Sequence, residues 1–200
     1  MSRHVMLVLV VVLTIALGCA SPRRVQTADM PAPLFNDLGG HECSISTDSP
    51  LAQRYFNQGL ILAYGFNHME AARAFAAAST VDPDCAMGHW GVALVHGPNI
   101  NRPMTAEDAA KAWDALQKAQ ALADRATDKE RALIDALSKR YAADPPQDRG
   151  PLDQAYADAM RDVAQRFPDD ADVQTLFAEA VMDTMPWDYW TLDGKPRPGT

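Results

Sequence analysis

Three side chains that could bind a metal ion lie in one short stretch of the sequence, DPDCAMGHWGVALVHGPNIN. Cys85 and His89 are four residues apart, one turn of a helix, and His96 follows on the same stripe. Thiolate and imidazole ligands suit Zn or Cu, and His68 is a further candidate. The sequence has no C-x2-C or H-E-x-x-H motif. One hypothesis is therefore a Zn or Cu site using His68, Cys85 and His89. The alternative is structural: Cys85 is a small buried side chain, and His68 bonds the backbone at a helix start.

The same cysteine allows a second covalent role. Cys43 and Cys85 are the two cysteines that follow Cys19. In an oxidising compartment they could form a disulfide that fastens the segment before the first helix to a later helix. Two free thiols are the other option.

The N-terminus indicates a compartment of that kind. Residues 1–18 combine a charged start with the apolar run VMLVLVVVLTIALG, which has signal-peptide length and is short for a membrane-spanning helix. The run ends in Ala16-Leu17-Gly18-Cys19, which resembles a bacterial lipobox with Cys19 as the lipidated residue. An ordinary cleaved signal peptide is the alternative. Because Ala20 is not Asp, the resemblance to Gram-negative lipoproteins implies an outer-membrane protein facing the periplasm, or a secreted one.

Composition divides the rest into a tether and one domain. Residues 19–40 contain the polar, proline-bearing string SPRRVQTADMPAP, which indicates a spacer. Residues 41–200 suffice for one domain of ordinary size. It begins with a short segment that has no helical period, which we expect to be extended. The net charge of −8 argues against a nucleic-acid partner.

From Ser49 onward the apolar residues have a helical period, and the first helices fit the tetratricopeptide pattern. The matching positions are Tyr55-x2-Gln58-Gly59-x2-Leu62, Ala71-x3-Phe75 and Pro83. In this pattern small residues stand where two antiparallel helices touch, an aromatic residue fills the groove to the next pair, and proline ends the unit. We therefore expect Gly59 and Ala71 at a helix contact and Phe75 between successive pairs.

The remaining helices are marked by their caps. A second unit begins near Ala86 and is interrupted by HGPNINRPM. Thr105 with Asp108, and Thr127 with Glu130, have the spacing of helix-capping boxes. We predict about seven helices and no strand. The predicted fold is therefore all-α: a tetratricopeptide-like α-solenoid of antiparallel helix pairs after a signal peptide and a short extended segment.

The order of several strings resembles a family of bacterial secreted tetratricopeptide-repeat proteins of unsettled function. The strings are YGFNHMEAARAF, DPDCAMGHWGVALVHGPNIN, KERALIDALSKRY, LDQAYADAMRDV and PWDYWTLDGKPRPGT, and they span about residues 41–200. His68 and Cys85 match the family motifs, whereas His89 and His96 fall at variable positions. Family members continue beyond the last string, so the resemblance implies that this chain is an N-terminal part of a longer protein.

A rigid surface of helix pairs favours binding over catalysis. We predict that a protein or peptide partner binds in the groove of the repeats. The candidate groove residues are Arg54, Tyr55, Asn57, His89 and Trp90. In the loop that breaks the repeat, Asn99 and Asn101 offer amides to a ligand, or they are structural turn residues.

No catalytic residue is assigned. The sequence lacks a glycine-rich phosphate loop, a G-x-S-x-G elbow and a C-x-x-C-H haem string. We therefore predict no cofactor, and enzyme activity is the less favoured hypothesis. The alternative function is a metal-binding envelope protein whose Zn or Cu site is completed by residues beyond Thr200.

Overall fold

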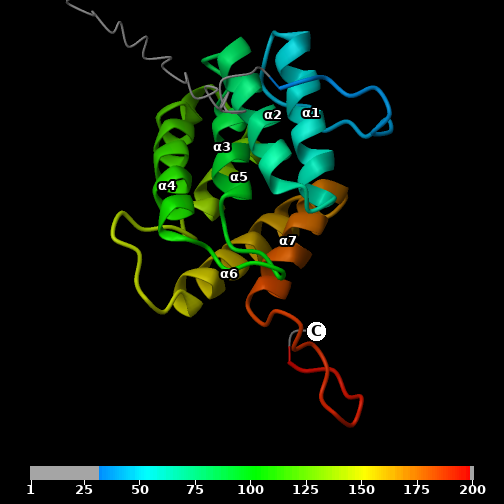
Figure 1. Cartoon of the computed structure of the whole chain (residues 1–200), viewed down its shortest axis with the longest axis vertical. Helices are drawn as coiled ribbons and strands as arrows, with labels where there is room; N and C mark the ends of the chain where they lie inside the picture. The colour runs from blue at the N-terminus through cyan, green and yellow to red at the C-terminus, as the bar shows by residue number, and fades with distance from the viewer. Residues whose placement is uncertain (1–31, 199–200) are drawn as a thin grey trace, which may run out of the picture. The chain divides into compact units, whose positions relative to one another are not determined.

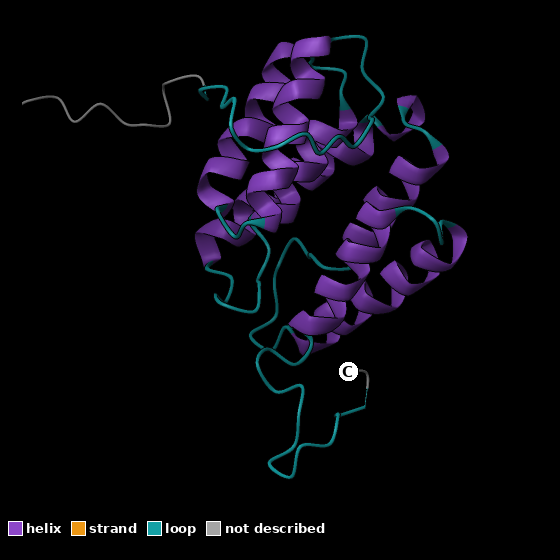
Figure 2. Ribbon diagram, turned by 90° about the vertical axis from the view of Figure 1, so that its right-hand side faces the viewer, coloured by secondary structure: helices purple, strands orange, loops and turns teal. Residues whose placement is uncertain are grey.

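The computed structural model describes residues 32–198, and every regular element in that range is a helix (Figures 1 and 2). Only isolated β-bridges occur there besides the helices. The predicted all-α class is confirmed. Cys19, the predicted signal peptide and residues 19–31 of the predicted tether lie outside the described residues.

The described chain contains seven α-helices, as the capping pattern predicts. They are α1 (Pro50–Tyr64), α2 (His68–Val81), α3 (Ala86–Val95), α4 (Ala106–Ala121), α5 (Asp128–Leu137), α6 (Gly150–Arg166) and α7 (Ala171–Asp183), with the 3-10 turn η2 (Ala123–Arg125) before α5. Over residues 32–198, none of these helices is both long and apolar enough to cross a membrane.

The predicted helix starts are confirmed by their side-chain caps. Ser49 accepts a hydrogen bond from the first turn of α1, and Pro50 opens that helix. Thr105 and Thr127 form complete capping boxes at the starts of α4 and α5. These bonds satisfy backbone N–H groups that have no partner within the helix, so they fix where each helix begins.

The α1, α2 and α3 helices meet around one aromatic ring. A Cβ atom added at Gly59 of α1 would lie 2.7 Å from the Phe75 ring of α2, and one added at Gly91 of α3 would lie 2.3 Å from it. Phe75 and Ala71 are fully buried. The expected contact at Gly59 and the expected position of Phe75 are therefore confirmed, because only glycine lets both helices approach this ring.

The α5, α6 and α7 helices form the second half of the core. Helix α6 packs against both α5 and α7. Leu133, Met160 and Leu176 belong to the same buried cluster as Trp90 of α3. The Trp90 indole Nε1 donates to the Leu133 carbonyl at 3.2 Å, which joins the two halves.

Residues 32–49 form an extended segment, and side chains of α1 hold the backbone of this segment. The Gln58 side chain accepts from the Phe35 N–H and donates to the Pro33 carbonyl, both at 2.8 Å. Gln53 pairs in the same way with the backbone of residues 43 and 45, at 2.8 and 3.0 Å. A pair of hydrogen bonds from one side-chain amide holds an extended backbone whatever the side chains of that backbone are.

The extended segment also reaches the second half of the core. Glu130 of α5 accepts from the backbone N–H of Ser46 at 2.6 Å and from its hydroxyl at 2.5 Å. His41 donates to Asp172 of α7 at 2.8 Å. The segment is thus bonded to α1, which directly follows it, and to α5 and α7, which are distant in sequence.

Candidate functional site

A mostly apolar pocket lies where α1, α3 and α7 come together. Its volume is about 280 Å³. The lining residues come from the end of α1, the start of α2, the end of α3, the following loop and the length of α7: Ala63, Tyr64, Phe66, His68, Leu94, Val95, Pro98, Ile100, Thr175, Leu176, Ala178, Glu179 and Met182. An apolar cavity with a few convergent polar groups is the usual form of a binding site.

One wall of the pocket is the loop that breaks the repeat pattern. Asn99 and Arg102 exchange two backbone hydrogen bonds of 3.0 Å, which close a tight turn. The Asn99 side chain also accepts from the Asn101 N–H at 2.9 Å. The structure thus makes Asn99 a turn residue, whereas Asn101 is exposed. The turn presents Pro98 and Ile100 to the pocket.

His68 is positioned by this loop. Its Nδ1 accepts a hydrogen bond from the Asn99 amide at 3.0 Å, and the ring also bonds the backbone of Ala63. The Phe66 ring stacks on the imidazole with centroids 5.9 Å apart. Burial lowers the pKa of His68 below its ordinary value. His68 is therefore a neutral, hydrogen-bonded part of the wall, in agreement with the structural interpretation of this residue.

A buried ionic cluster lies beside the pocket. The Arg140 guanidinium, which is 1% exposed, donates to Asp183 of α7 and, at 2.9 Å, to the carbonyl of Pro98. The same guanidinium lies 4.7 Å from the ring centroid of Tyr156. Arg140 therefore ties the pocket loop to α6 and α7, and its geometry depends on all three.

Two carboxyl groups share this single cation. Glu179 and Asp183 are one turn apart on α7, and Glu179 also lines the pocket. Burial and then the Glu179 carboxylate raise the pKa of Asp183 to about 8, against the opposing effect of Arg140. Glu179 Oε2 and Asp183 Oδ1 are buried atoms that accept from no N–H donor within residues 32–198, and the hydrogen bond between the two carboxyl groups raises the pKa of Asp183 further.

No local motif in the sequence identifies Arg140, Glu179 or Asp183 as a functional residue. Arg140 lies at the end of KERALIDALSKRY, one of the strings that carry the family resemblance, and this was the available signal. Glu179 and Asp183 have the i, i+4 spacing of one helix face, but so do many exposed acidic pairs. Their burial depends on α6 and on the loop after α3, which the spacing does not reveal.

The predicted groove residues do not form an open groove. Trp90 is 1% exposed and belongs to the core, so its assignment to the groove is corrected. Tyr55 and Asn57 bond the extended segment through their side chains, at 3.1 and 3.2 Å, so they already have an intramolecular partner. Arg54 is exposed. Half-buried His89 lies on α3, and burial and nearby Lys118 lower its pKa.

The predicted metal ligands are not brought together. Over residues 32–198, no three His, Cys, Asp or Glu side chains form a group that could hold a metal ion. Cys85 is buried at the start of α3, and the His68 ring is bonded to Asn99. The structure therefore supplies no ligand set from which a metal site could be argued.

Cys43 and Cys85 are free thiols, so the possible disulfide between them is not formed. Burial, followed by the charge of Asp172, raises the pKa of the Cys43 thiol to about 12. Burial likewise raises the pKa of Cys85. Because the thiolate is the nucleophile, neither cysteine is activated for covalent chemistry.

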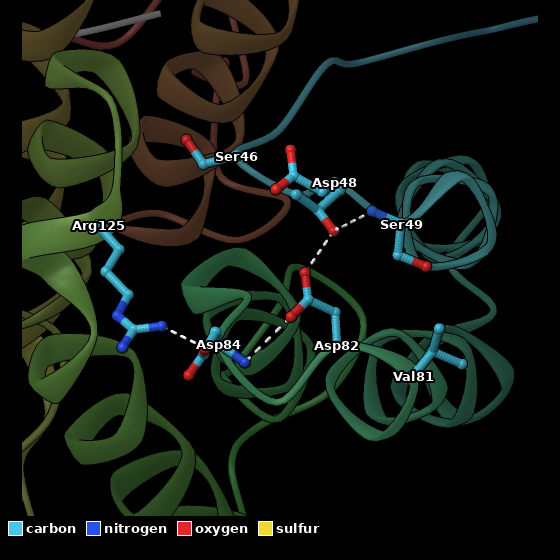
Figure 3. A pocket seen from close by; sticks show the side chains of 8 residues that line it. Ser46, Asp48, Ser49, Val81, Asp82, Asp84 and Arg125 are labelled. Carbon is cyan, nitrogen blue, oxygen red and sulfur yellow. Dashed lines mark hydrogen bonds and ion pairs between the residues drawn. The ribbon is translucent and has the colours of Figure 1, made fainter.

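A wider, more polar pocket lies where α1 and α3 begin (Figure 3). Its volume is about 590 Å³, and it is lined by Ser46, Thr47, Asp48, Ser49, Val81, Asp82, Asp84 and Arg125. Thr47 donates to Asp82, the Asp84 N–H donates to Asp82 at 3.1 Å, and Arg125 pairs with Asp84. These groups mainly satisfy one another at helix starts, so the apolar pocket is the stronger candidate for a ligand site.

Comparison with protein-family models, curated proteins and solved structures finds no match to this sequence. The candidate site therefore has to be interpreted from its own geometry.

Proposed function

We propose that this protein is a tetratricopeptide-like binding module of the bacterial envelope, tethered through lipidated Cys19 and facing the periplasm. Its partner is an extended segment of a protein or peptide. The compartment and the anchor rest on the sequence pattern of residues 1–19.

The helix contacts support the repeat assignment. Phe75 lies against Gly59 of α1 and Gly91 of α3, and a tetratricopeptide array would place its aromatic residue at a contact of this kind. Helices α1 with α2, and α3 with α4, are the sequential neighbours that would form two such pairs. In a repeat array, neighbouring pairs create the surface on which partners bind.

Helix α1 supports the choice of an extended ligand. Its amide side chains at Gln53, Asn57 and Gln58 already hold an extended backbone, although that backbone belongs to residues 32–49 of the same chain. The scaffold is therefore chemically suited to extended segments.

The observation that carries the proposal is the apolar pocket between α1, α3 and α7. Its cavity of about 280 Å³ is of a size for one large side chain, and its rim includes the exposed residues Phe66, Thr175 and Ala178. We assign it as the pocket that receives an apolar stem from the partner segment. A buried anchor side chain of this kind supplies most of the affinity in many interfaces.

A pocket-filling substitution tests this function. Dodecapeptides displayed on phage are selected on the full chain, and the affinities of the enriched peptides are measured by fluorescence polarisation. Ala178→Trp places an indole at the rim and should weaken binding by tenfold or more, on the order of 1.4 kcal/mol. Ala76→Trp, at an exposed alanine of α2, is the matched control and should bind like the wild type. The proposal would be overturned if no selected peptide binds Ala178→Trp more weakly than it binds the wild type.

A further inference from the structure

The ligand chemistry of the pocket is indicated by a single carboxylate. Most of the lining is aliphatic or aromatic, and Glu179 is its acidic residue. Within residues 32–198, the side-chain partner of Glu179 is the carboxyl group of Asp183, and Glu179 Oε2 is shielded from solvent without an N–H donor. A shielded carboxylate that relies on another carboxyl group is costly, because its lost hydration is only partly replaced.

Glu179 attracts Arg140 without contacting it directly, and no ion pair joins Glu179 to a basic side chain within residues 32–198. Arg140 donates to Asp183 and to the loop carbonyl of Pro98, and no hydrogen bond links it to Glu179. His68, the other basic side chain at the pocket, bonds Asn99 through Nδ1 and is held neutral by burial, which lowers its pKa. Two carboxyl groups thus share one cation and one proton, and Glu179 is the member of the pair that lines the pocket, where a second cation can approach.

We propose that this pocket binds an ammonium group on an aliphatic stem, which is the side chain of a lysine in the partner segment. The inference rests on the function proposed above and specifies its ligand. The four methylene groups of a lysine would pack against Leu94, Val95 and Leu176, while the ammonium donates to the carboxylate of Glu179.

The rim offers a second observation in favour of a ligand. Phe66, the residue after the α1 cap, has φ of 58°, in the left-handed region where glycine is normal at a helix C-terminus. A phenylalanine there is strained, and non-glycine residues in such conformations cluster at ligand-binding sites. The strained backbone places the half-exposed ring at the pocket and over His68, where it can cover a bound stem.

The test compares three probes of one length: n-hexylammonium, n-hexanol and hexanoate. The full chain is labelled with methyl-¹³C methionine and titrated at pH 7. The Met182 methyl group reports on the pocket, while exposed Met69 on α2 reports on non-specific binding. A charge-assisted hydrogen bond should make n-hexylammonium bind roughly tenfold or more tightly than n-hexanol, with hexanoate weakest.

Glu179→Gln should abolish the preference for the ammonium while keeping the n-hexanol affinity. Glu107→Gln, at a fully exposed glutamate of α4, is the matched control. Equal binding of n-hexylammonium and n-hexanol, or an unchanged preference in Glu179→Gln, would overturn the lysine assignment and leave the pocket as an apolar peptide site. If no probe moves the Met182 signal, the pocket itself fails, and the proposed function fails with it.

Discussion

The contact among α1, α2 and α3 and the contact among α5, α6 and α7 are both buried, but they are built from opposite chemistry. In the first, the Phe75 ring lies between Gly59 and Gly91, without a charged group at the contact. In the second, Arg140 lies over the Tyr156 ring and pairs with Asp183. The first contact is specified by the fit of the Phe75 ring between two glycines, and the second by the pairing of opposite charges.

This difference determines what each contact can do. An apolar contact holds two helices together and responds mainly to changes in volume. An ionic contact adds little net stability over an apolar one, because burying the charges costs about as much as their attraction returns. The ionic contact borders the pocket and bonds its loop at Pro98. We infer that the charges serve to position the pocket, with stability as a secondary consequence.

The largest effect should follow from breaking the ionic contact. Arg140→Met keeps the length of the side chain but leaves the Asp183 carboxyl buried without its cation. We expect a loss of about 3–5 kcal/mol in the free energy of unfolding, measured by urea denaturation. Arg161→Met is the control, because Arg161 is half-exposed where it pairs with Asp158, and it should cost no more than about 1 kcal/mol.

A triple substitution sharpens the interpretation. If pairing is what the contact requires, Arg140→Met with Asp183→Leu and Glu179→Gln should recover much of the loss, because no charge of the cluster then remains without a partner. If Arg140→Met alone has the same free energy of unfolding as the wild type, charge pairing does not specify this contact.

The apolar contact should be sensitive to added volume. In Gly91→Ala the new methyl group would lie 2.3 Å from the Phe75 ring, so the ring or α3 must shift. Overpacking outweighs the better helix propensity of alanine, and we expect a net loss of about 2 kcal/mol by thermal or urea unfolding. Gly40→Ala, where a Cβ atom meets no other group within 4 Å, should be close to neutral. A stabilised Gly91→Ala protein would show that this contact is not tightly packed.

The two contacts also differ in how far the sequence predicts them. Helical period, capping boxes and the spacing of Gly59, Ala71 and Phe75 predicted the helices and the apolar contact, because these signals are local or repeat along the chain. The open groove was not predicted correctly. Nothing in the spacing of Trp90 reveals that it would be covered by α5, nor that residues 32–49 would lie along α1.

The candidate pocket was predicted only in part. The break in the repeat at HGPNIN drew attention to the loop, and that loop does form a wall of the pocket. Glu179 and Arg140 were missed because they come together only when segments about forty residues apart along the chain pack against one another, and such non-local pairing leaves no periodic trace in one sequence.

The smallest effect that separates the two contacts is their dependence on pH. The folded-state pKa of Asp183 is raised to about 8, above the value of about 4 expected in the unfolded chain. The folded protein therefore binds more protons between these values, and the stability from this group is lost as the pH rises through 8. The free energy of unfolding should fall by at most about 1.4 kcal/mol per pH unit.

The measurement is urea unfolding at several values between about pH 7.5 and 8.5, a window chosen because carboxyls with ordinary pKa values and His68, whose pKa in the fold is lowered from the ordinary value of about 6.5, are then nearly all deprotonated in the folded and the unfolded state. Asp183→Asn should remove the decline, whereas Asp114→Asn, at an exposed aspartate of α4, should keep it.

The titratable and charged groups around Asp183 are Glu179 on α7, Arg140 and Tyr141 after α5, and Tyr156 on α6. Burial raises the pKa of both tyrosines further above the ordinary tyrosine value, so neither titrates in this window. Parallel curves for the wild type and Asp183→Asn would mean that Asp183 stays ionised, and the ionic contact would then hold two full negative charges against Arg140.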